Sequence, residues 1–318
     1  MASFVPNKQR LDPEKFKNPF VTAKGEPRAH VDLRALKTLW FNTGTLCNIA
    51  CANCYIESSP RNDRLVYIRA AEVATYLDEI ERDRLGTDLI GFTGGEPFMN
   101  PEIIPILDET LWRGFNVMVL TNAMKPMHHK RRPLLELRKR YGERLVIRVS
   151  IDHYTQELHE QERGPRSWDP TIVGLRWLAQ NGFRLNIAGR LFSGEPETVV
   201  REGYGSLLAE HGVPVDAQSL VELVLFPEMD ETVDVPEITD RCWGILNVPP
   251  EAVMCATSRM VIKRKGADRP SVVSCTLLPY DPQFEMGHTL ADASGRVWLN
   301  HPHCAKFCVL GGASCAAG

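Results

Sequence analysis

Three cysteines stand close together near the start of the chain, because Cys47, Cys51 and Cys54 fall within eight residues. Thiolates are the soft ligands that iron in iron–sulfur clusters prefers, so three thiols on one loop can bind three corners of a cubic cluster. The fourth iron would keep an open position, as catalytic metal sites do. The alternatives are a zinc knuckle or three unrelated buried cysteines, although the next histidine is the distant His128.

A glycine-rich segment, Thr93-Gly94-Gly95-Glu96-Pro97, follows about forty residues later. Its two glycines allow backbone conformations with positive φ and a close approach of carbonyl oxygens to a ligand. Carbonyl oxygens accept hydrogen bonds from ammonium groups. Taken alone, the same residues are typical of an ordinary turn.

The Cys-x3-Cys-x2-Cys spacing followed by Gly-Gly-Glu-Pro resembles the radical S-adenosylmethionine superfamily, over about residues 38–226. The resemblance implies a [4Fe-4S] cluster held by Cys47, Cys51 and Cys54. It also implies that S-adenosylmethionine chelates the open iron through its amino and carboxylate groups. The segment from Thr93 to Pro97, including Gly94, Gly95 and Glu96, would then bind the methionine amino group.

Polar residues after the next strands extend the resemblance. Ser150 and Asp152, followed by His159 and Arg163, are similar to the residues with which the family contacts ribose or the methionine carboxylate. Asp152 can accept bonds from ribose hydroxyls, or it can merely cap the following helix. Arg190 can bind the carboxylate in a bidentate geometry, or it can form a surface salt bridge.

One position departs from the family. The residue before the last cysteine is often aromatic there and stacks near the adenine, whereas this chain has Asn53 followed by Tyr55. We therefore expect Tyr55 or backbone groups to contact the adenine.

A second group of thiols lies in the last 64 residues: Cys255, Cys275, Cys304, Cys308 and Cys315. The first two flank an expected β-hairpin, which would bring them together at its open end. This layout resembles the Twitch or SPASM extensions of the family, which hold an auxiliary [4Fe-4S] cluster.

The expected ligands of the second site are Cys255, Cys275, Cys304 and Cys308, with Cys315 as the substitute. The alternative is a structural zinc site, for which His301 and His303 are further candidates. Cys242 is interpreted as a buried or free thiol.

Short apolar runs alternate with helix-like stretches through most of the chain. Strands are expected at 38–42, 89–92, 116–121, 145–151, 184–188 and 220–226, and helices at 69–84, 101–112, 132–141, 170–181 and 197–211. Six such units predict an α/β fold, a partial (β/α)6 TIM-like barrel with its ligands at the carboxyl ends of the strands. The predicted division is a lead-in at 1–37, a core domain at 38–226, an acidic linker at 227–253 and a small Cys-rich hairpin domain at 254–318.

Composition limits the class of protein. The chain has 318 residues, 43% of them hydrophobic, and its 37 basic and 40 acidic residues give a formal net charge of −3. Neither a membrane span nor a nucleic-acid-coating surface is indicated, and the polar N-terminus predicts no signal peptide. We expect a cytoplasmic protein whose cysteines are reduced. The basic stretch at 125–144 is interpreted as a solvated helix face rather than a phosphate site.

The resemblance implies an enzyme that cleaves S-adenosylmethionine to a 5′-deoxyadenosyl radical, which removes hydrogen from a substrate. An auxiliary cluster would favour net oxidation, and flavodoxin or ferredoxin is an expected reductant. A small-molecule substrate is favoured because only about 37 residues precede the first strand, too few for a peptide-recognition domain. A peptide-modifying enzyme is the second hypothesis. A non-catalytic iron–sulfur or zinc-binding protein is the alternative from another class.

Overall fold

The computed structural model describes residues 9–228 and 230–311. Its main sheet has nine strands in the order β10-β9-β8-β2-β3-β4-β5-β6-β7. Six of them form a continuous parallel series: β2 (Thr38–Asn42), β3 (Leu89–Thr93), β4 (Asn116–Thr121), β5 (Leu145–Ser150), β6 (Arg184–Leu191) and β7 (Leu223–Pro227). This succession confirms the predicted α/β class.

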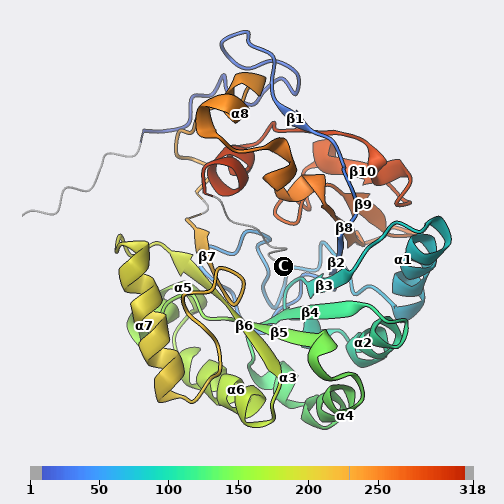
Figure 1. Cartoon of the computed structure of the whole chain (residues 1–318), viewed down its shortest axis with the longest axis vertical. Helices are drawn as coiled ribbons and strands as arrows, with labels where there is room; N and C mark the ends of the chain where they lie inside the picture. Colours follow the sequence, from blue (N-terminus) through green and yellow to red (C-terminus); the bar gives the residue numbers. More distant parts are fainter. Residues whose placement is uncertain (1–8, 229, 312–318) are drawn as a thin grey trace, which may run out of the picture.

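Helices connect these strands and lie around the outside of the sheet (Figure 1). They are α1 (Ala70–Asp83), α2 (Ile103–Trp112), α3 (Lys125–His128), α4 (Arg131–Tyr141), α5 (Gln156–Arg163), α6 (Trp168–Gln180) and α7 (Glu197–Glu210). Each helix therefore carries the chain back so that the next strand runs parallel to the previous one. The carboxyl ends of all six strands lie at the same end of the sheet.

Strand β2 illustrates how the core is built, because all five of its residues are buried. Leu39 and Phe41 pack in the apolar core shared with the helices, whereas Trp40 points to the opposite face and packs with residues of the C-terminal region. Neighbouring Gly91 makes room for this ring, since a Cβ there would lie 2.2 Å from Trp40. A strand buried on both faces is typical of a parallel sheet between two layers.

The C-terminal region extends this sheet. The predicted hairpin is present as β8 (Ser258–Ile262) and β9 (Ser271–Val273), and β8 pairs in parallel with β2. Strand β10 (Glu285–Gly287) continues beyond β9. A separate ribbon joins β1 (His30–Val31) to β11 (Val297–Trp298), so the two ends of the described chain pack together.

The acidic segment after β7 is more structured than a solvated connector. It contains α8 (Asp240–Leu246), which lies near the N-terminal lead-in (Figure 1). Carboxylates of the segment pair with basic residues of that lead-in. Asp234 lies 2.7 Å from the Lys15 ammonium group, and Glu237 lies 2.5 Å from the buried Arg28 guanidinium. The acidic run is therefore the electrostatic partner of the basic residues before β1.

Element boundaries differ from the sequence predictions by a few residues. Strands β3 and β6 run on to Thr93 and Leu191, while β7 begins at Leu223 because residues 216–222 form turns. Helix α5 has no counterpart among the predicted elements.

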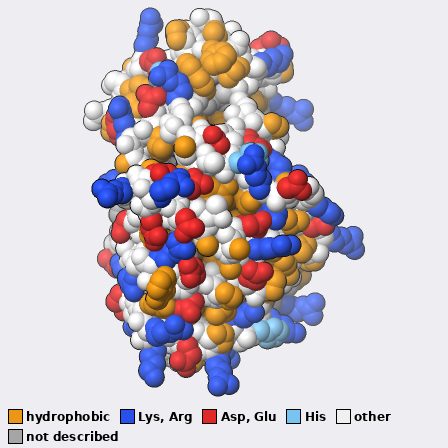
Figure 2. Space-filling view, turned by 90° about the vertical axis from the view of Figure 1, so that its right-hand side faces the viewer, with side chains coloured by type: hydrophobic (Ala, Val, Ile, Leu, Met, Phe, Trp, Pro, Cys, Tyr) orange, Lys and Arg blue, Asp and Glu red, His pale blue; other side chains and the backbone are white. Residues whose placement is uncertain are grey.

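The surface mixes both signs of charge, as the near-neutral composition predicts. On the face shown in Figure 2, basic and acidic side chains are interspersed with small apolar areas. Within the described ranges, no helix combines the length and apolar character needed to cross a bilayer.

Candidate functional site

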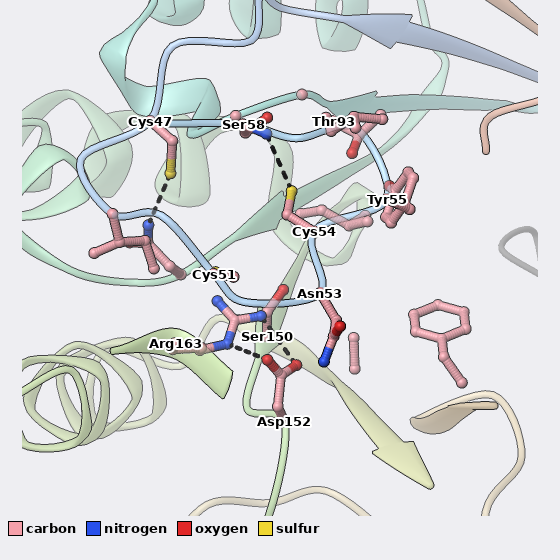
Figure 3. Close-up of a pocket in the computed structure, with 18 of the residues that line it drawn as sticks. Cys47, Cys51, Asn53, Cys54, Tyr55, Ser58, Thr93, Ser150, Asp152 and Arg163 are labelled. Atoms are coloured by element: carbon pink, nitrogen blue, oxygen red, sulfur yellow. Dashed lines mark hydrogen bonds and ion pairs between the residues drawn. The ribbon is translucent and has the colours of Figure 1, made fainter. Parts of the chain in front are cut away.

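A cavity of about 150 Å³ opens at the carboxyl ends of the parallel strands (Figure 3). Its lining brings together residues that end β3, β4, β5, β6 and β7 with the cysteine loop that follows β2: Cys47, Ile49, Cys51, Asn53, Cys54, Tyr55, Ile56, Ser58, Thr93, Gly94, Gly95, Leu120, Thr121, Asn122, Ser150, Asp152, Arg163, Ala188, Arg190, Phe226, Leu277 and Phe307. Most of the predicted site residues therefore share one cavity.

The three cysteines of the first triad surround one side of this cavity, and none is in a disulfide. The sulfur of Cys54 accepts a hydrogen bond from the Ser58 amide at 3.3 Å. The sulfur of Cys47 lies 3.9 Å from Nδ2 of Asn122, which β4 supplies from the next strand but one. Such donors would stabilise the negative charge of the thiolates once a bound cation has displaced their protons.

Burial affects the protonation of two of these thiols. It raises the pKa of Cys47 to about 12 and that of Cys51 to about 11. Both groups are therefore neutral thiols at physiological pH when no cation is bound, and a metal that binds them must displace protons.

Gly94 and Gly95 form the contact between β3 and the cysteine loop. Gly94 has φ +139°, and a Cβ on Gly95 would lie 2.1 Å from the Leu46 carbonyl oxygen. The Gly95 amide donates to the Gly44 carbonyl at 2.8 Å. Any side chain at Gly95 would displace the backbone that leads into Cys47, so close packing alone requires this glycine.

Glu96 and Pro97 lie outside the cavity lining, unlike the three residues before them. The Glu96 carboxylate is buried and accepts bonds from the Thr121 hydroxyl at 2.9 Å and the Asn122 amide at 2.9 Å. Burial raises the pKa of Glu96 to about 7. In this structure, Glu96 ties the end of β3 to the end of β4.

Ser150 and Asp152 both line the cavity, and their contact with S-adenosylmethionine stays a prediction. Asp152 forms a two-point ion pair with Arg163, with Nε to Oδ2 at 2.9 Å and Nη2 to Oδ1 at 3.2 Å. Burial opposes the charge of Arg163, but the neighbouring Asp152 and Cys51 raise the pKa of its guanidinium above the ordinary value. Helix capping is thus not the main contact of the Asp152 carboxylate.

Arg190 and Asn53 meet at a buried carboxylate that the sequence analysis did not assign. Glu162 Oε2 lies 2.5 Å from Nη1 of Arg190, and both Glu162 oxygens lie 3.0 Å from Nδ2 of Asn53. Arg190 is therefore not at the surface, and one of its two terminal nitrogens is already occupied. Tyr55 lines the cavity with its side chain partly exposed.

A second, smaller cavity collects the thiols of the C-terminal region. Its lining consists of Val253, Met254, Cys255, Cys275, Leu277, Phe284, Val297, Leu299, His303, Cys304 and Cys308. These include the four expected thiols, whereas Cys315 lies outside the described residues. Burial raises the pKa of Cys255 to about 11. The pKa of Cys304 lies well above its usual value because of burial and of the neighbouring thiols of Cys275 and Cys255.

The two histidines of the zinc alternative lie beside this second cavity. Nε2 of His303 is 3.1 Å from a Glu231 carboxylate oxygen, and Nε2 of His301 is 3.7 Å from the same oxygen. Of the two, only His303 lines the cavity. Cys242 lies outside both cavities, where its sulfur accepts from the Thr239 amide at 3.4 Å.

Several residues that line the first cavity, or that contact its lining as Glu162 does, were missed by the sequence analysis. Glu162 lies on α5, whose polar sequence gives no apolar periodicity, and only the resemblance pointed to neighbouring Arg163. Asn122 directly follows β4, so its position at a strand end was a usable signal. Leu277 and Phe307 carry no chemical signature, and their nearness to cysteines 275 and 308 was the only hint.

Comparison with known proteins gives a consistent match. The Radical SAM superfamily matches residues 41–198. The antilisterial bacteriocin subtilosin biosynthesis protein AlbA of Bacillus subtilis (strain 168) is 31% identical over 147 residues, which cover 46% of this chain and 31% of AlbA. The mycofactocin maturase MftC of Mycobacterium tuberculosis (strain CDC 1551 / Oshkosh) is 28% identical over 137 residues, which cover 43% of this chain and 33% of MftC. The chain thus spans about a third of the length of these relatives.

Solved structures share the fold at low identity. Streptococcus suis SuiB bound to its precursor peptide SuiA superposes with a TM-score of 0.58 at 13% identity, covering 80% of this chain and 63% of SuiB. The structure of anSMEcpe with bound AdoMet gives a TM-score of 0.57 at 12% identity, covering 80% of this chain and 79% of that chain. These likenesses confirm the predicted partial-barrel fold.

Proposed function

The chain belongs to the radical SAM superfamily. We propose that it binds S-adenosylmethionine in the first cavity, cleaves it to a 5′-deoxyadenosyl radical, and uses that radical to remove hydrogen from a peptide substrate. The observation that carries this proposal is the shared cavity of Cys47, Cys51 and Cys54 with the Gly94–Gly95 turn at the carboxyl ends of the strands. Ligands of barrel folds bind at that end.

The residues around the first cavity fit a cluster with one open corner. Three thiols come from one loop, and the described lining contains no fourth thiol. A [4Fe-4S] cluster held there would supply the electron that splits S-adenosylmethionine into methionine and a 5′-deoxyadenosyl radical. The chain's own contribution is to hold the three sulfurs, with Asn122 and the Ser58 amide directed at two of them.

The polar half of the lining supports a site for S-adenosylmethionine. Backbone carbonyls of the segment from Thr93 to Gly95 can accept from its ammonium group, and Asp152 can accept from ribose hydroxyls beside its pair with Arg163. Arg190 can donate to the carboxylate, through the nitrogen that Glu162 leaves unoccupied. Tyr55 is our candidate for the adenine contact.

The second cavity supports an auxiliary [4Fe-4S] cluster held by Cys255, Cys275, Cys304 and Cys308. Four thiols saturate such a cluster, and the remaining lining is apolar except for His303. We propose that this site, as part of a Twitch- or SPASM-like region, accepts an electron during substrate oxidation. A zinc ion is the competing occupant of this cavity. Metal analysis distinguishes the two, because the cluster contributes iron and sulfide and the alternative contributes zinc.

A peptide substrate is favoured over the small molecule expected from the sequence. AlbA is described as a bacteriocin biosynthesis protein, and SuiB has been solved with a precursor peptide. The matched segments cover only part of those proteins, so their substrates enter as a hypothesis for this chain.

The catalytic part is tested by reconstituting the protein with iron and sulfide without oxygen, adding dithionite and S-adenosylmethionine, and measuring 5′-deoxyadenosine. Formation above the Cys47→Ala background supports the proposal. Retention of iron without binding of S-adenosylmethionine would instead indicate a non-catalytic iron–sulfur protein. Flavodoxin and ferredoxin can be compared with dithionite as the electron source.

The substrate class is tested with unlabelled S-adenosylmethionine and an extract of cells grown in deuterated medium, separated into peptide and small-molecule fractions. Transfer of deuterium from the peptide fraction into 5′-deoxyadenosine supports the proposal, whereas transfer only from the small-molecule fraction overturns the peptide part and leaves the radical chemistry intact.

A further inference from the structure

We propose that Glu162 is a positioning residue of the first cavity: it holds Arg190 and the cysteine loop so that Arg190 meets the carboxylate of S-adenosylmethionine. This inference rests on the proposed function and assigns a role to a residue that neither the motifs nor the comparisons point to.

Glu162 lies at the end of α5 and is 4% exposed. Its Oε2 accepts from Nη1 of Arg190 at 2.5 Å. A buried carboxylate paired in this way fixes a guanidinium group in both position and plane, because each partner lacks water as an alternative.

Glu162 also holds the loop between Cys51 and Cys54. Both of its carboxylate oxygens accept from Nδ2 of Asn53 at 3.0 Å, and its main-chain oxygen accepts from the Ala52 amide at 2.7 Å. One residue therefore connects the span between two cluster thiols with a strand on the other side of the cavity. This contact also gives the amide of Asn53 a function at the position where the family often has an aromatic ring.

Arg190 has one donor that is still available. The residue is 8% exposed and lines the cavity, and its Nη2 is buried with no hydrogen-bond partner among the described residues. A buried guanidinium nitrogen without an acceptor is costly unless a ligand supplies one. An anionic group entering the cavity would supply that acceptor.

The neighbouring charges direct the anion to Arg190. Arg163 already has a two-point partner in Asp152 (Figure 3), whereas Glu162 faces Arg190 with a single oxygen. Of these two guanidinium groups, Arg190 thus has the weaker internal pairing.

The test is a double-mutant cycle on the affinity for S-adenosylmethionine, measured by equilibrium dialysis with labelled ligand on the iron-loaded protein. Glu162→Gln keeps the shape of the side chain and removes its charge, and it should weaken binding about tenfold because a neutral hydrogen bond holds a guanidinium group less firmly than a charge-assisted one. Arg190→Ala should weaken it by a similar or larger factor. The double variant should bind about as weakly as Arg190→Ala alone, because Gln keeps an acceptor for Asn53 and so removes only the part of the Glu162 effect that acts through Arg190.

A kinetic readout separates positioning from general damage. The KM for S-adenosylmethionine should rise in Glu162→Gln while kcat for 5′-deoxyadenosine stays near the wild-type value. Glu157→Gln is the matched control, because Glu157 is exposed on the same helix and lies outside the cavity lining. If Glu162→Gln fails to load iron, Glu162→Asp keeps the charge with a shorter reach and should still show weaker binding.

Unchanged affinity in an iron-loaded Glu162 variant, or losses that add in the double variant, would overturn the inference. A wild-type protein that loads iron but binds no S-adenosylmethionine would instead overturn the proposed function. The two failures are therefore distinguishable in one set of measurements.

Discussion

Two cysteine-lined cavities in this molecule differ in size and in the polarity of the residues around their thiols. The first measures about 150 Å³ and surrounds three thiols with one carboxylate, two guanidinium groups, hydroxyls and amides. The second measures about 20 Å³ and surrounds four thiols with aliphatic and aromatic side chains and one histidine. A site that must admit a polar ligand needs polar partners for it, whereas a saturated metal site needs only exclusion of water. The surroundings, more than the thiols, therefore indicate which site reacts.

The cavities also share structure. Leu277 lines both, and Phe307, next to Cys308, lines the first. Phe307 stacks on Phe226 at the end of β7, with ring centroids 5.5 Å apart. The segments that carry the second set of thiols thus supply two apolar residues to the lining of the first cavity, and Leu277 is a wall that both cavities share.

The largest expected effect comes from the first triad. Cys47→Ala should lower 5′-deoxyadenosine formation to the level of enzyme-free controls, because three thiolates are the minimum set for the proposed cluster. Chromatographic quantitation of 5′-deoxyadenosine checks this result. Cys242→Ala removes a thiol outside both cavities and should retain full activity. A Cys47→Ala protein that still forms 5′-deoxyadenosine would contradict the assignment of the first cavity as the reacting site.

Removing a thiol of the second cavity should separate the cleavage of S-adenosylmethionine from the modification of the substrate. Cys304→Ala should lose about half of the bound iron, since each cubic cluster holds about four iron atoms. Formation of 5′-deoxyadenosine should persist while substrate modification stops, because the first cavity keeps its ligands. Iron analysis and product detection on the same sample check this, and equal loss of both activities would show that the cavities act as one site.

The shared wall provides a test of stability. Leu277 is 5% exposed, and Leu277→Ala should lower the free energy of unfolding by about 3 kcal/mol, as other buried leucine truncations do. Chemical unfolding checks the value, with Leu220→Ala as control because Leu220 is 69% exposed. A loss no larger than in the control would mean that the wall is not closely packed.

A smaller effect concerns pH. Burial raises the pKa of Glu96 to about 7 from the ordinary 4.5, so the folded chain binds a proton between these values that the unfolded chain releases. Stability should therefore fall as pH rises through this window, by at most about 1.4 kcal/mol per pH unit, and should level off above it. Unfolding of the metal-free chain compared with Glu96→Gln checks this, because the variant should lack that component. Parallel pH profiles would contradict the predicted burial effect.

The sequence predicted the features that repeat or that are chemically rare. Strands β2 and β4 have the predicted bounds because their apolar runs end sharply at polar residues, and the seven cavity thiols were identified because cysteines at such spacings have few other uses. Pairing of β8 with β2 was not predictable from local patterns, since it depends on the free edge of the sheet.

The sequence did not reveal which polar residues would face one another. Helix α5 has the sequence QELHEQER with a single leucine, so no apolar stripe marks it as a helix. Its Glu162 reaches Asn53 and Arg190 only after three elements have packed together. Long-range contacts of this kind are set by tertiary structure and leave no short motif.

The most direct test of the account is iron and sulfide analysis of anaerobically reconstituted protein, comparing the wild type with a Cys47/Cys51/Cys54 triple-alanine variant. The account predicts about eight iron atoms per wild-type chain and about four in the variant, with no zinc in either. A colourless wild-type protein, or one whose thiols hold zinc in place of iron, would contradict it.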